Sequence, residues 1–219
     1  MATREVLAQL AAQYQQASAQ TVSASSAGGV DVSRRVQTGV PVDVVVLASN
    51  AIDQLIADGK LRAGSRVDLV RSGIAIALRA GAPRPDIGSE QAVRDLVLSA
   101  RTIGYSTGPS GLYLEKLFER WGILAEIKSR TVQAPPGVPV GSLVARGEIE
   151  LGFQQLSELL HLPGITVLGA LPDAIQSITT FSAAVGASST QPEAARAFIA
   201  FMAAPAATAA KQLHGMDPA

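Results

Sequence analysis

Residues 66–78, RVDLVRSGIAIAL, and residues 178–185, ITTFSAAV, are the two stretches on which the predicted fold depends. Both are rich in apolar and β-branched residues, which favour strands. The first is long enough to run from one lobe into another. Together they divide the chain into an outer lobe, residues 1–74 with 186–219, and an inner lobe, residues 75–185. The cleft between two such lobes is the expected ligand site.

Strands and helices alternate along the chain between these stretches. Residues 42–47 form an almost continuous apolar run, as in a strand covered on both faces, and a helix ending at Gly59 follows. The same order recurs where a strand over 101–105 leads through the turn 106–111 into a helix over 112–121. This alternation predicts an α/β fold in which each lobe is a mostly parallel sheet flanked by helices.

Local signals predict several element boundaries. Residues 4–17 have helical apolar spacing, and Thr3 is expected to cap that helix. Residues 21–25 are interpreted as a short β segment. Thr190 and Glu193 have the spacing of a capping box before the helix that follows them.

The composition indicates a folded protein without a preference for polyanions. Apolar residues make up 47% of the 219 residues, and 18 Lys and Arg balance 18 Asp and Glu. No net field therefore attracts nucleic acid or an anionic membrane, so nucleic-acid partners are not expected. Cysteine is absent, which excludes disulfides and thiolate metal sites.

Membrane insertion and export signals are not predicted within the chain. The longest apolar runs are far shorter than the roughly 20 residues of a spanning helix. The first residues, MATRE, show neither the basic nor the apolar region of an export signal. We expect a monomer that is not embedded in a membrane.

Two polar turns are candidate anion sites. In open α/β sheets, ligands bind at the carboxyl ends of strands, where helix N-termini present N–H groups. Ser49 and Asn50 stand at such a place in the outer lobe, and Ser106, Ser110 and Gly111 in the inner lobe. Their neutral donors suit a hydrogen-bonded anion. Ser49 is equally well explained as a helix cap.

Further candidates lie on predicted strands. Gln154 and Gln155 end a strand, and the two-residue period directs one side chain to the cleft, Gln155 being favoured. Thr180 and Arg71, on the two crossing strands, are also candidate ligand contacts. For Thr180 an ordinary strand position is the alternative.

Catalytic machinery is difficult to find in the sequence. The chain has only two histidines, His161 and His214, and no spacing indicates a metal site, a cofactor or a Ser-His-Asp arrangement. We predict no metal and no cofactor. Catalysis by Tyr105 or by a carboxylate such as Glu158 stays an open alternative without a supporting pattern.

Several segments resemble the periplasmic molybdate-binding family of ABC-transporter substrate-binding proteins. The resemblance rests on VDVVVLASNAIDQLIADGKL, RSGIAIALRAGAP, YSTGPSGLYLEKLFERWGI, VPVGSLVARGEIELGFQQLSEL and STQPEAARAFIAFMAAPAA, and covers almost the whole chain. It implies a two-lobed type II periplasmic-binding-protein fold, a periplasmic location, and a membrane ABC permease as partner.

The resemblance also implies roles for individual residues. Ser49 resembles the family's serine after the second strand, Ser110 and Gly111 its anion-binding helix start, and Gln154 with Gln155 its second contact strand. The family usually begins with a strand and a serine that precede Met1, so we expect the first strand to lie upstream or to be replaced by another segment. The paired glutamines and the GPSG turn differ from the usual molybdate set.

These observations leave three functional interpretations. The first is a solute-binding protein for a small oxyanion or carboxylate. The second is an isomerase, because the chain also resembles an aconitate-isomerase-like branch, in which a proton and a double bond move within a tricarboxylic acid. The third and weakest is a ligand-sensing domain.

Overall fold

A computed structural model describes residues 1–219 of the protein, which form two compact units. Unit 1 consists of residues 1–71 with 179–219, and unit 2 of residues 72–178. The first division falls within the long strand that the sequence predicts over 66–78. The second falls at the start of the strand over 178–185, so nearly all of that strand belongs to unit 1.

Unit 1 is built on a sheet of strands in the order β1 (Val44–Ala48), β7 (Ile178–Val185) and β2 (Val67–Arg79). β1 runs antiparallel to β7, and β8 (Asp217–Pro218) pairs antiparallel with β2. Successive residues of β1 alternate between two apolar clusters, so both faces of the strand are covered, as predicted.

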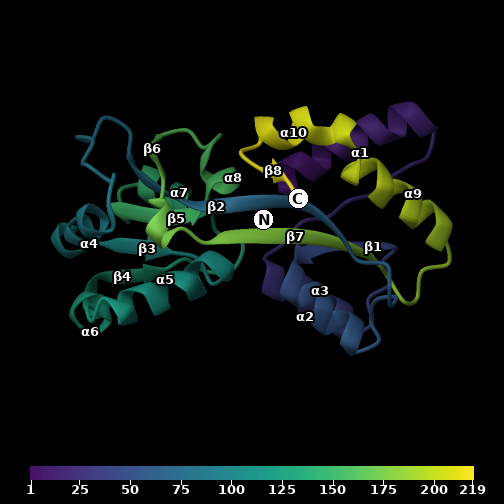
Figure 1. Cartoon of the computed structure of the whole chain (residues 1–219), viewed down its shortest axis with the longest axis horizontal. Coiled ribbons are helices and arrows are strands. Elements are labelled where there is room, and N and C mark those ends of the chain that lie inside the picture. Colours follow the sequence, from purple (N-terminus) through teal and green to yellow (C-terminus); the bar gives the residue numbers. More distant parts are fainter. The chain divides into compact units, whose positions relative to one another are not determined.

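Helices cover the two faces of this sheet (Figure 1). One face packs against α1 (Arg4–Ser18), α9 (Pro192–Ala203) and α10 (Thr208–Leu213). The other packs against α2 (Gly29–Gln37) and α3 (Ser49–Ala57). A 3-10 turn over Pro205–Ala207 joins α9 to α10.

Unit 2 contains a mixed sheet in which β2 has a partner strand on each side. β5 (Leu151–Gln155) and β6 (Ile165–Ala170) both pair antiparallel with β2. β3 (Ile103–Tyr105) lies parallel to β5 and to β4 (Thr131–Gln133). The predicted α/β class is confirmed, although antiparallel pairs are more frequent than the predicted mostly parallel sheets.

The helices of unit 2 connect these strands. They are α4 (Glu90–Ser99), α5 (Pro109–Arg120), α6 (Leu124–Ile127), α7 (Val140–Ala145) and α8 (Leu156–Leu159), with 3-10 turns at Lys128–Arg130 and Asp173–Ile175.

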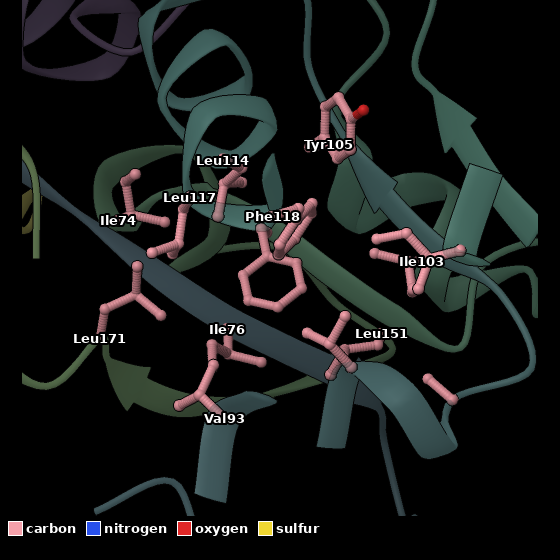
Figure 2. Packing of buried hydrophobic residues seen from close by; sticks show 14 of the residues in the cluster. Ile74, Ile76, Val93, Ile103, Tyr105, Leu114, Leu117, Phe118, Leu151 and Leu171 are labelled. Atoms are coloured by element: carbon pink, nitrogen blue, oxygen red, sulfur yellow. The ribbon is translucent and has the colours of Figure 1, made fainter. Parts of the chain in front are cut away.

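Phe118 of α5 is fully buried in the largest apolar cluster of unit 2. Its ring lies 6.2 Å from the ring of Phe153 on β5 and 6.2 Å from that of Tyr105 on β3. Figure 2 shows it among side chains from β2, β3, β5 and α4. This packing holds α5 against the strands whose ends form the candidate site.

Three local predictions are wrong. Residues 21–25 form no strand, because no neighbouring strand pairs with them and the segment is largely exposed. Thr3 precedes α1 but its side chain makes no capping hydrogen bond. Glu193 forms an ion pair with Arg196 in place of a capping box.

Membrane-spanning segments are not found among the helices, none of which combines the necessary length with the necessary apolarity.

We predict that Phe118→Ala lowers the free energy of unfolding by about 3–5 kcal/mol, because it leaves a cavity at the centre of the unit 2 core. Leu112→Ala on the same helix, where Leu112 is 56% exposed, should change it by less than about 0.5 kcal/mol. Urea unfolding followed by circular dichroism measures both. Equal effects of the two substitutions would contradict the packing described.

Lys211 of α10 is an unusual component of the unit 1 interior. The residue is only 2% exposed. Burial lowers the pKa of its ammonium group, and no neighbouring carboxylate opposes this effect. The charged form is therefore less stable in the folded protein than in the unfolded chain.

We predict that Lys211→Met raises the free energy of unfolding near neutral pH by about 1 kcal/mol, because methionine fills a similar volume without a charge to desolvate. In the parent protein, stability should rise as pH increases from the lowered folded-state pKa towards the ordinary value of 10.5. The variant should lack this rise. Lys116→Met, at an exposed position of α5, is the control, and a less stable Lys211→Met protein would refute the prediction.

Candidate functional site

The turn after β3 leads directly into α5, whose first turn carries two predicted ligand residues. The helix begins at Pro109 and not at residue 112 as predicted, so Ser110 and Gly111 are helical. Proline suits the first helical position because its fixed φ matches the helix and its missing N–H needs no partner. Gly108 is the cap residue, and no side chain caps the helix. The first-turn N–H groups are therefore available to a ligand at the positive end of the helix dipole.

Two hydroxyl groups lie beside these N–H groups. The Oγ atoms of Ser106 and Ser110 are 3.4 Å apart, and Ser106 Oγ accepts a hydrogen bond from the Gly108 N–H at 3.3 Å. Ser110 is buried, whereas Ser106 is half-buried. Because no lysine or arginine occurs in residues 105–111, the turn offers neutral hydrogen-bonding groups only.

Gly111 permits the close approach of α5 to the end of β3. A Cβ atom at this position would lie 1.7 Å from the Ser106 carbonyl oxygen and 3.1 Å from the Tyr105 ring. The first distance is far inside van der Waals contact, so any side chain would push the helix start away from the strand. Glycine at 111 therefore fixes the spacing between the two serine hydroxyls.

Tyr105, at the end of β3, acts as a hydrogen-bond donor in the structure. Its hydroxyl donates to Glu115 Oε1 at 3.2 Å. Burial, followed by the negative charge of Glu115, raises the pKa of Tyr105 to about 12. Tyr105 thus stays protonated at neutral pH, which argues against it as a general base.

The end of β5 is next to the end of β3. Tyr105 and Phe153 are paired in the parallel register, so the residues that follow them reach the same edge of the sheet. Gln154 and Gln155, each 2% exposed, are the last residues of β5, as predicted. Ser106, Ser110 and Gly111 are thus brought together with the two glutamines at one edge.

Gln154 is held by two neighbours. Its Oε1 accepts a hydrogen bond from the Val140 N–H at the start of α7, at 2.9 Å. Its side-chain amide is also hydrogen-bonded to Glu158. Gln154 therefore has a positioning role within unit 2, and the preference for Gln155 as a ligand contact stays a prediction.

Ser157, in α8, is a residue that the sequence interpretation did not name, whereas Glu158, next to it, was named there as an open catalytic alternative without a supporting pattern. Glu158 is half-buried, and burial, the largest influence on the pKa of its carboxyl group, raises that pKa. Ser157 Oγ is buried and makes no hydrogen bond. Both residues follow directly after β5, the strand predicted to contact the ligand, and this position in the sequence could have indicated them.

Unit 1 carries the other predicted residues. Ser49 is the first residue of α3, but the cap residue is Ala48 and no side chain caps this helix, so the capping interpretation of Ser49 is wrong. Ala48 pairs with Phe181 across β1 and β7, which places Ser49 and Thr180 at the same edge of the sheet. Asn50 is exposed one residue further along the helix.

Arg71 lies in β2. Its Nε and Nη2 donate to the Pro218 carbonyl oxygen at 3.2 and 3.0 Å, and the residue is exposed. The guanidinium thereby adds side-chain hydrogen bonds to the pairing of β2 with β8. Contact of Arg71 with a ligand stays a prediction. No group of three or more His, Cys, Asp or Glu residues is arranged to hold a metal ion.

Comparison with known proteins gives one relative of high similarity. A protein named aconitate isomerase, from a Pseudomonas species, is 41% identical to this chain over 188 residues. The match covers 85% of this chain and 71% of that protein.

Solved structures share the fold at lower identity. The periplasmic molybdate-binding protein of Azotobacter vinelandii has a TM-score of 0.80 at 23% identity, covering 98% of this chain and 94% of its own. The protein PEB3 with bound L-phospholactate has a TM-score of 0.76 at 15% identity, covering 99% and 96%. These likenesses confirm the predicted type II periplasmic-binding-protein fold.

The family is established over nearly the whole chain. The model that describes bacterial extracellular solute-binding proteins matches residues 1–217. With the shared fold and the 41% identical relative, this match shows that the chain belongs to the bacterial extracellular solute-binding protein family.

Proposed function

We propose that the chain captures a small organic anion that carries carboxylate groups, and that unit 2 supplies essential contacts. The observation that carries this proposal is the start of α5, where the N–H groups of Ser110 and Gly111 lie beside the hydroxyls of Ser106 and Ser110. Donors without a full charge hold an anion by directed hydrogen bonds. They also release it more readily than a fixed ion pair would.

Two observations favour a carboxylate over molybdate as the ligand. The relative at 41% identity is named for a tricarboxylate, whereas the molybdate-binding protein shares only the fold at 23% identity. The other solved neighbour holds L-phospholactate, an organic anion. Ser49, Asn50, Arg71, Gln155 and Thr180 remain predicted ligand contacts.

We further propose a transport role in the periplasm. Family membership supports delivery of the ligand to a membrane ABC permease. A ligand that binds one conformation better than another shifts the protein towards it, and this shift would signal the loaded state to the permease. We propose that the protein acts as a monomer in this cycle.

Isomerisation of a small polycarboxylate is the second candidate function. It is favoured by the aconitate isomerase relative and by a half-buried carboxyl group, Glu158, at the edge of the sheet that carries the anion-binding turn. Moving a double bond within the ligand requires a group that removes and returns a proton.

We predict that Gly111→Ala lowers the free energy of unfolding by about 1–3 kcal/mol and abolishes ligand-induced stabilisation, because the new Cβ displaces the helix start. Gly108→Ala is the matched control for stability, since its Cβ would meet only Ser106 Oγ at 3.4 Å. Thermal unfolding with and without ligand measures both effects. Parent-like stability and ligand response of Gly111→Ala would contradict the proposed geometry.

We predict that cis- or trans-aconitate or citrate stabilises the protein against thermal unfolding. A ligand at 100 times its dissociation constant adds about 2.7 kcal/mol, which corresponds to roughly 5–10 °C in Tm for a protein of this size. Molybdate, tungstate, sulfate and phosphate are the comparison ligands. Stabilisation by molybdate or tungstate alone would overturn the carboxylate proposal and support oxyanion transport.

A further inference from the structure

We infer that Glu158 is the catalytic residue that transfers the proton in the proposed isomerisation, first as base and then as acid. This inference rests on the second proposed function and adds to it the residue that performs the chemistry. It is carried by the place of Glu158 at the anion-binding edge of unit 2 and by the contacts that hold its carboxyl group.

The topology of unit 2 places the start of α8, which carries Glu158, at the same sheet edge as the start of α5. β3 and β5 are adjacent and parallel, so the α5 turn and α8 both begin at the same sheet edge. Glu158 lies in the first turn of α8, directly after the two glutamines that end β5. A ligand carboxylate held by the first turn of α5 would therefore leave the rest of the ligand next to this edge.

The ionisable side chains at this edge are few. Residues 105–112 and 154–160, which form the two strand ends and the two helix starts, contain only Tyr105 and Glu158 as titratable groups. Tyr105 keeps its proton because its pKa is about 12. Glu158 is therefore the one carboxylate in these two segments, and Glu115, further along α5, already accepts a hydrogen bond from Tyr105.

A chain of hydrogen bonds fixes the carboxyl group. The Val140 N–H donates to Gln154 Oε1, which leaves the NH2 group of Gln154 to donate to the Glu158 carboxylate. A base oriented by a second residue, itself held by the backbone, is the arrangement expected of catalytic carboxylates. Burial also raises the pKa of Glu158, which increases its strength as a base once it is ionised.

Ser157 supplies an independent sign of ligand contact. Its hydroxyl is buried without a hydrogen-bond partner, although buried hydroxyl groups are normally satisfied. The residue immediately precedes Glu158. A ligand carboxylate at this edge would accept the missing hydrogen bond from the Ser157 hydroxyl, and this bond would orient the ligand.

The proposed step conserves all atoms and electrons of the substrate. The Glu158 carboxylate removes a proton from a methylene carbon next to the substrate double bond. The electron pair of that C–H bond forms the new double bond, and the electrons of the former double bond take a proton from Glu158 at the far carbon. The carboxylate is thereby restored, and no oxidant or reductant is needed.

We expect Glu158→Gln to separate chemistry from binding, because glutamine keeps the volume and removes the base. The dissociation constant of trans-aconitate, measured by calorimetry, should change less than about threefold. The isomerisation rate, followed by proton NMR, should fall by about 10²–10⁴-fold. Exchange of the substrate methylene protons with D2O should fall in parallel.

Two further variants make the test specific. Glu119→Gln, at an exposed position in the last turns of α5, should keep parent binding and rate. Glu158→Asp retains a carboxylate at a shorter reach and should bind normally with a reduced rate. If Glu158→Gln fails to bind or fold, the Asp variant decides: normal binding with a reduced rate supports the inference, and any other result overturns it.

The outcomes distinguish the inference from the functions on which it rests. A parent-like rate in Glu158→Gln would overturn the role of Glu158 and leave the isomerase proposal intact. Binding of trans-aconitate by the parent protein without isomerisation would overturn both, while the carboxylate-binding function would stand. Absence of binding by any tricarboxylate would overturn the carboxylate proposal itself.

Discussion

The pairing of a single strand, β2, is the constraint on which the rest of the structure depends. Its first residues pair with β8 in unit 1, and its last residues pair with both β5 and β6 in unit 2. Ile74 and Ile76 pack into the core beneath α5, while Ala75 and Ala77 face the opposite side near α8. A shift of one residue in this register would exchange the two faces and bury the wrong side chains. The positions of β5 and β3, and of the helix starts that follow them, therefore derive from β2.

The candidate site is organised by backbone geometry more than by charge. The approach of Gly111 to the Ser106 carbonyl oxygen brings a helix N-terminus and two hydroxyls together, and proline at 109 begins the helix where its N–H groups are uncommitted. Such donors bind the oxygen atoms of an anion, whatever atom carries them. This is consistent with the ligands of two proteins that share the fold, one named for molybdate binding and one with bound L-phospholactate. Ligand identity then depends on the side chains around this shared start.

The two proposed functions, binding and isomerisation of a polycarboxylate, would require nearly the same site. Neutral donors that hold a polycarboxylate serve either function, so the difference between transport and isomerisation depends on one group that exchanges protons. Glu158 is buried enough to have a raised pKa and is oriented by Gln154. If a polycarboxylate binds as proposed, the step from a binding protein to an enzyme on this fold would require few changes, because the half-buried carboxyl group of Glu158 lies at the same sheet edge as the anion-binding turn.

The sequence by itself determined the α/β class, the long strands β2 and β7, and the grouping of Ser106, Ser110 and Gly111, because these follow from local periodicity and turn chemistry. It also predicted that two glutamines close β5. Only the tertiary structure decided that residues 21–25 are not a strand, that Gln154 is held by α7, and that burial raises the pKa of Glu158. A strand needs a partner, and a carboxyl group acquires its pKa from its surroundings. Both depend on segments distant in the chain, which local patterns do not contain.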